Sequence, residues 1–221
     1  LLKATNHTFQ GLNLTLEDIE SNWIGLRPLI HEVGKDPSEL SRKDELFLSK
    51  SGLISIAGGK LTGYRKMADR VLAAVSKQLT ASQKSKLKRS STKKIPLVTP
   101  AIKTSKEVVA YQDELKNQLA EMEITDPYMS WYLCTTYGKN ADLILDKKPT
   151  FKEGSTQEQL IRAELWYCIQ HEMTNSLADF FVRRTSRLYF DIDSVTQYME
   201  IILRDCIHYL DWTWAQSFQY S

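Results

Sequence analysis

Two glycines followed by a lysine, Gly58-Gly59-Lys60, constrain the fold of this chain more than any other feature. The preceding residues 52–57 form a short apolar, β-branched run that is typical of a buried strand. Apolar residues then recur at helical spacing, at Met67, Val71, Leu72 and Val75. The glycines therefore mark a strand-to-helix turn, which brings backbone amides and a helix N-terminus close to an anionic or electron-rich group. Lys60 adds a mobile positive charge, although a plain loop fits the same pattern.

Glycine and charge are distributed unevenly along the 221 residues. Seven of the nine glycines precede residue 64, and residues 1–100 carry 17 Lys and Arg against 9 Asp and Glu. Residues 101–221 carry 12 Lys and Arg against 18 Asp and Glu and are nearly free of glycine. The sequence thus predicts an α+β fragment, a strand–turn–helix piece followed by an all-α domain. We expect three parts: the end of a larger domain over residues 1–80, a basic linker over 81–103, and a helical C-terminal domain over 104–221.

The second half of the sequence is divided by helix-capping patterns. Side chains suited to an N-cap precede five apolar periodic segments, at Thr104, Asp126, Ser155, Ser176 and either Asp191 or Asp193. Four of the five tryptophans lie in this half, and we expect its aromatic residues to pack in the core. The three cysteines, Cys134, Cys168 and Cys206, form no C-x-x-C pair. They are expected to be reduced core thiols of a cytoplasmic protein.

Charged residues of the second half and of the linker were considered as sites for a metal, a substrate, a membrane or nucleic acid. His171-Glu172 begins like a zinc-helix signature, but residue 175 is Asn, so no metal site is expected. Arg183 and Arg184 are expected to pair with acidic neighbours among Glu164, Glu172 and Asp179; a substrate role is the alternative. The six positive charges of residues 84–94 form either a solvated connection or a contact with an anionic membrane surface. Nucleic acid is not expected, because no aromatic residues interleave with these lysines.

Three motifs follow one another in the first half: W-x-G-L-R-P-L from residue 23, S-R at 41–42 and G-G-K-L-T-x-Y-R-K-M-A from residue 58. This order resembles the C-terminal part of FAD-dependent glycerol-3-phosphate dehydrogenases, the respiratory enzymes of bacteria and mitochondria. The close resemblance covers residues 12–75. A looser one, to the helical C-terminal domain of that family, continues in residues 162–173 and 179–185. The resemblance implies that the chain is a C-terminal piece of such an enzyme. It also implies that the ADP half of the FAD site lies upstream, since no G-x-G-x-x-G motif is present.

The resemblance also implies roles for particular residues. Arg27, Arg42 and Thr92 correspond to substrate-binding positions, and guanidinium groups suit the phosphate dianion of glycerol 3-phosphate. Pro28 restricts the backbone at Arg27. The cofactor-binding turn corresponds to Gly58, Gly59, Lys60, Leu61 and Thr62. Lys60 is the expected catalytic residue, because the N1–C2=O edge of FAD gains negative charge during reduction. Residues 1–80 would then end the FAD/substrate domain, and no general base is identified.

The implied reaction is oxidation of sn-glycerol 3-phosphate to dihydroxyacetone phosphate by hydride transfer to FAD, with electrons passed to the quinone pool. Similar oxidases use oxygen instead, but those of some cocci carry a long insertion for which the 32 residues between Arg27 and Lys60 leave no room. Alternatively, the isolated chain is an inactive helical interaction or structural module without bound FAD, because half a cofactor site supplies few contacts. We expect a cytoplasmic protein, peripheral on the inner face of the membrane, and a homodimer is compatible with the sequence.

Overall fold

The structure, a computed structural model, describes residues 1–26, 44–213 and 215–216. By their contacts the residues group into two units, Ile24–Ile95 and a second unit made of Leu1–Trp23 and Pro96–Ser221. Over these residues the chain is mostly helical with one short antiparallel hairpin, which confirms the predicted fold class. The contact grouping places the first 23 residues with the helical domain, which composition does not reveal. The three sequence-based domain boundaries stay predictions.

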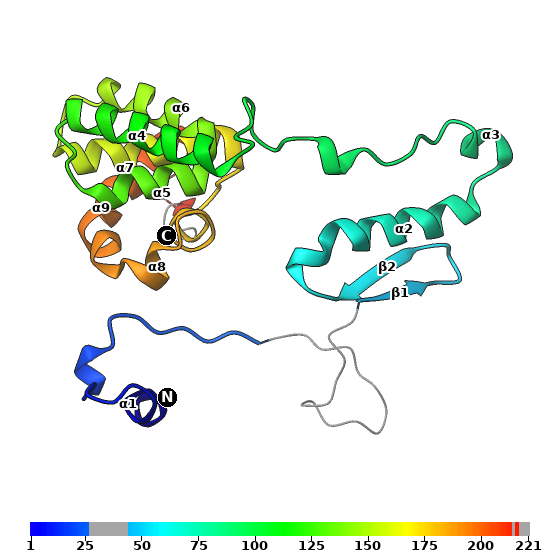
Figure 1. The fold of residues 1–221 in the computed structure, drawn as a ribbon, viewed down its shortest axis with the longest axis horizontal. Coiled ribbons are helices and arrows are strands. Elements are labelled where there is room, and N and C mark those ends of the chain that lie inside the picture. Colours follow the sequence, from blue (N-terminus) through cyan, green and yellow to red (C-terminus); the bar gives the residue numbers. More distant parts are fainter. Residues whose placement is uncertain (27–43, 214, 217–221) are drawn as a thin grey trace. The chain divides into compact units, whose positions relative to one another are not determined.

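The smaller unit is a hairpin covered by a helix. Strands β1 (Asp44–Leu48) and β2 (Ile54–Gly58) are antiparallel, with Leu46 opposite Ile56. A 3-10 turn, η2 (Leu61–Gly63), leads directly into α2 (Tyr64–Gln78), which lies along the hairpin (Figure 1). Two short elements follow, α3 (Ala81–Lys84) and η3 (Thr92–Lys94). Strand β2 and helix α2 were predicted from the sequence pattern, whereas β1 was not.

The expectation that β2 is a buried strand is wrong. Its side chains alternate between half-buried and exposed, because in the described part of the chain β2 pairs only with β1 and α2 covers one face. On α2, the predicted positions Met67, Val71 and Val75 are half-buried, whereas Leu72 is exposed. Within the described residues, every buried side chain lies at or after Tyr111. The described part of the smaller unit therefore contains no fully buried side chain.

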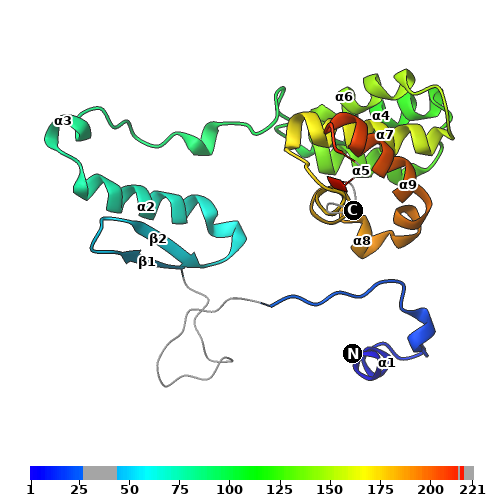
Figure 2. The same cartoon turned by 180° about the vertical axis from the view of Figure 1, so that it is seen from behind.

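The helical unit contains nearly all the elements of the second half (Figure 2). Its α-helices are α4 (Ser105–Glu121), α5 (Pro127–Tyr137), α6 (Ala141–Lys147), α7 (Thr156–Glu172), α8 (Arg187–Phe190) and α9 (Ile192–Tyr209). Between them lie η4 (Gly138–Asn140), η5 (Lys148–Thr150) and a π-helix, η6 (Asp179–Arg184). The N-terminal residues of this unit form α1 (Leu2–Thr8) and η1 (Leu16–Asp18).

The predicted helix starts are confirmed. Thr104, Asp126, Ser155 and Asp191 accept hydrogen bonds at the starts of α4, α5, α7 and α9. Ser176 Oγ accepts from the Asp179 amide at 3.0 Å and begins the fourth predicted helix, which takes the π form. Helices α6 and α8 were not predicted, because each is short and follows the preceding turn without a capping side chain.

The core of the helical unit is formed by α4–α7, η6 and α9. Fully buried positions include Leu115, Ile144, Leu165, Phe180 and Ile202. All three cysteines are buried and unbonded to one another, as predicted. In the described ranges, we find no helix both long enough and apolar enough to cross a bilayer.

Candidate functional site

The turn after β2 needs both of its glycines. Gly58 has φ +75° and Gly59 has φ +78°, in the left-handed region that side chains rarely adopt. At Gly59 a Cβ would also lie 2.8 Å from Met67 Sδ and 3.2 Å from Asp44 Cβ. Two features therefore exclude a side chain at Gly59. The turn is closely packed between β1 and α2, and its backbone has a positive φ. The glycine pair found in the sequence is a requirement of this local geometry.

Lys60 stands at the N-cap of η2, with extended backbone angles of φ −102° and ψ +142°. Its carbonyl oxygen accepts from the Gly63 amide at 2.8 Å, which closes the 3-10 turn. The side chains of Lys60, Leu61 and Thr62 are all exposed, Leu61 by 90%. The first amides of a helical run lack intrahelical acceptors, so the turn can present N–H groups together with an ammonium group. Such a donor set fits an electron-rich or anionic ligand edge.

An ion pair fixes the turn against the hairpin. The Arg70 guanidinium on α2 pairs with the Asp44 carboxylate on β1, and its Nη1 also donates to the Asp44 carbonyl oxygen at 3.1 Å. Because Asp44 Cβ lies against the Gly59 position, this pair holds together the three elements that form the turn. The pair was missed at the sequence level, since β1 was not recognised there.

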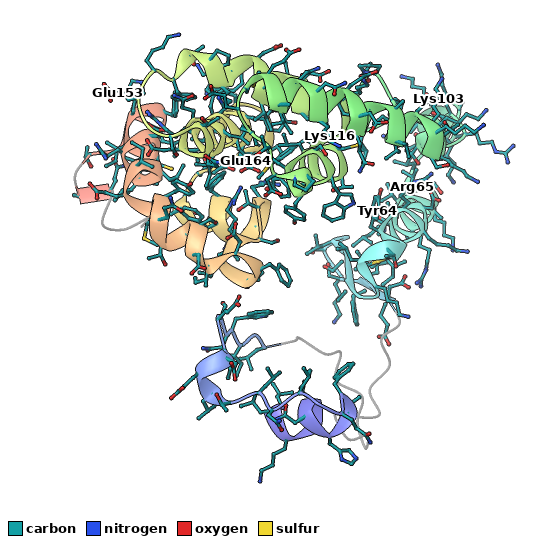
Figure 3. The ribbon with its side chains drawn as sticks, turned by 60° about the vertical axis from the view of Figure 1, so that its left-hand side comes forward. Tyr64, Arg65, Lys103, Lys116, Glu153 and Glu164 are labelled. Carbon is teal, nitrogen blue, oxygen red and sulfur yellow. The ribbon has the colours of Figure 1, made fainter. Side chains whose placement is uncertain are left out.

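Thr92 is brought to the first turn of α2. The Arg65 guanidinium donates from Nη2 to Thr92 Oγ1 at 3.1 Å, and the Ser90 hydroxyl lies 3.3 Å from the same oxygen. Figure 3 labels Arg65 beside Tyr64 at the start of this helix. Arg65 was not among the predicted site residues, although it stands within the G-G-K-L-T-x-Y-R-K motif. The structure thus connects residues 58–68 with the basic linker through Arg65, a residue that was not predicted from the sequence.

Arg27 and Arg42 lie outside the described residues, so their substrate-binding role stays a prediction. The described part of the smaller unit therefore shows the predicted cofactor-binding turn and Thr92, but not the two arginines.

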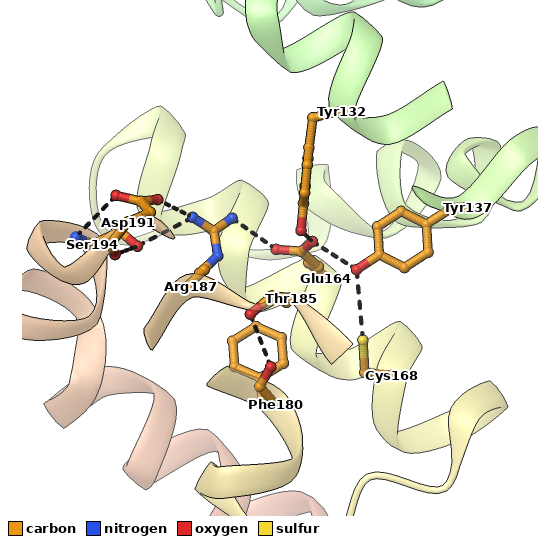
Figure 4. A network of polar contacts seen from close by, with 9 residues as sticks. All are labelled: Tyr132, Tyr137, Glu164, Cys168, Phe180, Thr185, Arg187, Asp191 and Ser194. Atoms are coloured by element: carbon orange, nitrogen blue, oxygen red, sulfur yellow. Dashed lines mark hydrogen bonds and ion pairs between the residues drawn. The ribbon is translucent and has the colours of Figure 1, made fainter. Parts of the chain in front are cut away.

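A second polar cluster is buried inside the helical unit (Figure 4). The Glu164 carboxylate on α7 accepts from the phenols of Tyr132 and Tyr137, the latter at 2.7 Å, and from Arg187 Nη2 at 3.0 Å. Arg187 also donates to Asp191 Oδ2 at 2.8 Å. Burial, and next the Glu164 charge, raise the pKa of the Tyr137 phenol well above its ordinary value. With three donors, Glu164 is satisfied, so this cluster fits a structural role.

Other charged residues of the helical unit form the expected pairs. Arg183 Nη1 lies 2.6 Å from Asp179 Oδ1, and Arg184 Nε lies 4.0 Å from Glu172 Oε2. These pairs agree with the expectation of ion pairing, whereas Glu164 pairs with Arg187, which the sequence did not indicate. Within the described residues, no group of His, Cys, Asp and Glu side chains is arranged to hold a metal ion.

Comparisons with known proteins place the chain in a family. Residues 90–217 match the family model described as the C-terminal domain of alpha-glycerophosphate oxidase. The aerobic glycerol-3-phosphate dehydrogenase of Bacillus subtilis is 41% identical over 211 residues, which are 92% of this chain and 37% of that protein. The enzyme of the same name from Staphylococcus aureus strain USA300 is 39% identical over 222 residues, 100% of this chain and 40% of that protein.

A solved structure is also similar along nearly the whole chain. The X-ray structure of the glycerol-3-phosphate dehydrogenase from Bacillus halodurans complexed with FAD has a TM-score of 0.79 and 36% sequence identity, covering 99% of this chain and 41% of that one. The chain thus spans about two fifths of the length of the relatives it matches. It belongs to the family of alpha-glycerophosphate oxidase C-terminal domains and is homologous to the C-terminal two fifths of aerobic glycerol-3-phosphate dehydrogenases.

Proposed function

We propose that this chain forms the C-terminal part of an FAD-dependent enzyme that oxidises sn-glycerol 3-phosphate to dihydroxyacetone phosphate and passes electrons to quinone. The observation that carries the proposal is the alignment of 92–100% of the chain with aerobic glycerol-3-phosphate dehydrogenases at 39–41% identity. The turn at residues 58–62 supports it, because the glycines allow a tight turn that leaves the Lys60 side chain exposed beside the start of a 3-10 helix, whose first amides lack helical acceptors.

The residues of this turn are suited to hold the flavin edge. FAD, when bound, supplies the hydride acceptor, and its N1–C2=O edge gains negative charge as it is reduced. We assign the amides of residues 59–62 and the Lys60 ammonium to that edge, where they stabilise the developing charge. Arg70 and Asp44 hold the turn in place. Arg65 holds Thr92, so that its hydroxyl can contribute to substrate binding.

Substrate binding is assigned to Arg27, Arg42 and Thr92. The test is Arg27→Ala in the complete enzyme, with Arg204→Ala, an exposed arginine on α9, as the matched control. Losing a charge-assisted phosphate contact costs about 2–3 kcal/mol, so we expect KM for glycerol 3-phosphate to rise roughly 30- to 150-fold while bound FAD is retained. An unchanged KM in the Arg27 variant would remove the substrate assignment.

A second candidate is an oxidase that uses oxygen, favoured by the family model described for alpha-glycerophosphate oxidase. The short spacing between Arg27 and Lys60 favours the dehydrogenase. The two are separated by measuring substrate turnover with a soluble quinone and with oxygen, and by assaying hydrogen peroxide. Peroxide formed in equal amount to the ketone product, with no quinone reduction, would establish the oxidase.

The basic segment over residues 84–94 is the proposed contact with the inner face of the membrane. All six of its Lys and Arg side chains are exposed. Each basic residue near an anionic surface contributes about 1 kcal/mol at physiological salt. The chain should therefore sediment with phosphatidylglycerol vesicles, and this binding should weaken as the salt concentration is raised. Equal binding to neutral phosphatidylcholine vesicles would exclude this role.

A further inference from the structure

A pocket with a volume of about 660 Å³ lies inside the helical unit, between α5 and the segment over residues 184–191. Pockets that hold small organic ligands measure about 300–1,000 Å³, so this one is large enough for such a ligand. One face of α5 forms the first wall, with Tyr128, Trp131 and Tyr132 followed one turn later by Thr135 and Thr136. None of the lining residues takes part in the proposed flavin reaction.

The aromatic side chains of α5 form a row of neighbouring rings. The Tyr128 ring lies 5.3 Å from the Trp131 ring and 6.1 Å from the Tyr132 ring, measured between centroids. Tyr128 and Trp131 nevertheless stay 56% and 51% exposed. On the opposite wall Phe190 is 78% exposed, and its ring is packed edge-on against Trp23. Aromatic faces gathered at the surface in this way are typical of sites that bind another flat group.

The guanidinium of Arg184 provides the pocket with free donors. Its side chain is 38% exposed, its Nε lies 4.0 Å from Glu172, and it forms no hydrogen bond in the part of the chain that the structure describes. The two carboxylates in the lining are engaged: Asp126 accepts from an amide of α5 at 2.9 Å, and Asp191 pairs with Arg187 at 2.8 Å. A guanidinium presents a planar fork of donors that matches a phosphate group. The pocket therefore suits an anion beside an aromatic ring.

The wall opposite α5 has an unusual but fixed backbone. Helix η6 ends at Arg184 in the π form, and Ser186 has φ +56°. Both conformations cost free energy, and both occur frequently at functional sites. Arg187 then reaches the buried Glu164 carboxylate, which also binds the phenol of Tyr132 from the other wall (Figure 4). The two walls are thus joined through the core, so the pocket is formed before any ligand binds.

We propose that this pocket binds a mononucleotide, with its base against Trp131 and Tyr128 and its phosphate on Arg184. Stacking on an aromatic side chain is available to every base, so these rings supply affinity without selecting one base. The hydroxyls of Thr136 and Ser186 also line the pocket and form no hydrogen bond within the described residues, so they can bind the sugar hydroxyls. A base or a phosphate alone would meet only part of this set.

The test is isothermal titration calorimetry of the whole chain with AMP. We expect one saturable site with Kd below about 1 mM, and weaker binding as the salt concentration is raised. Arg184→Gln should weaken AMP binding at least about 10-fold, because it removes charge-assisted hydrogen bonds. Trp131→Ala should weaken it at least about fivefold, because it removes the stacking face.

Two further variants serve as controls. Trp131→Phe keeps an aromatic ring, so its Kd should stay within about threefold of the wild-type value. Arg183→Gln changes the neighbouring arginine, which lies outside the pocket lining and pairs with Asp179 at 2.6 Å. Since Arg183 is an exposed surface residue, this change should alter Kd less than about twofold. Equal effects of Arg183→Gln and Arg184→Gln would overturn the proposal.

Titrations of the unaltered chain decide the proposal even if a variant folds poorly. Adenosine and inorganic phosphate should each bind at least about 10-fold more weakly than AMP, since each lacks half of the contacts. Equal binding of adenosine would exclude the Arg184 contact, and equal binding of phosphate would exclude the aromatic one. The absence of saturable AMP binding would overturn the proposal outright. In that case, a concentration-dependent dimer that is lost in Trp131→Ala would assign the aromatic face to a second copy of the chain.

Discussion

Replacing Arg187 by Met should destabilise the helical domain strongly, because it leaves the Glu164 carboxylate buried without its cation. The Arg187 side chain is 13% exposed and that of Glu164 only 2%. Breaking a buried ion pair by removing one partner costs about 3–5 kcal/mol. The two tyrosine donors remain and each stabilises the charge, so we expect the lower end, about 3 kcal/mol. The lost contact with half-exposed Asp191 adds less than about 1 kcal/mol.

The assay is urea unfolding of the chain followed by tryptophan fluorescence. Four of the five tryptophans lie in the helical half, so the signal reports mainly on this domain. Domains are typically stable by about 5–15 kcal/mol, so the variant should stay folded with a clearly lower midpoint. Arg204→Met is the matched control: its Nη2 lies 3.8 Å from Glu200 Oε1 with side chains 65% and 88% exposed, and it should change stability by less than about 0.5 kcal/mol.

A double variant isolates the charge itself. Adding Glu164→Gln to Arg187→Met removes the uncompensated carboxylate, so part of the lost stability should return, about 1–2 kcal/mol. If Arg187→Met were no more destabilising than Arg204→Met, or if the double variant lost the sum of the single effects, the Glu164–Arg187 ion pair would not stabilise the domain.

Three further outcomes are expected. Lys60→Met in the complete enzyme should slow flavin reduction at saturating substrate more than it raises KM, because the ammonium stabilises charge that develops in the transition state; a wild-type reduction rate in stopped flow would exclude this role. Burial raises the pKa of Cys206 to about 12, so its thiol should react with iodoacetamide at pH 8 about 1000-fold more slowly than an ordinary thiol; rapid alkylation of the native chain would contradict this. The stability due to this shift should be complete below about pH 9 and should be lost as the pH rises towards 12. Residues 96–221 should fold alone, since they contain the whole buried core and Ile102, which packs against it. A helix-rich circular-dichroism spectrum with a cooperative melt is expected, and the absence of a cooperative melt would count against an independent domain.

Local features could be predicted from the sequence because neighbouring residues determine them. The capping side chains at Thr104, Asp126 and Ser155 bond to amides two or three positions along the chain, so their spacing alone indicates the helix starts. The glycines at 58 and 59 likewise meet a local requirement for positive φ. The order of the three motifs indicated the family, and the comparisons confirmed this family over nearly the whole chain.

Only the tertiary structure decided which distant residues meet. Arg65 and Thr92, 27 positions apart, and Arg187 and Glu164, 23 apart, are joined because helices pack in three dimensions, which no pattern along one segment records. Strand β1 depends on pairing with β2, since a short strand gains its hydrogen bonds from a partner. In the sequence, Trp23 is the first residue of a motif. Its contact with Tyr189, 166 positions further along, exists only in the folded chain.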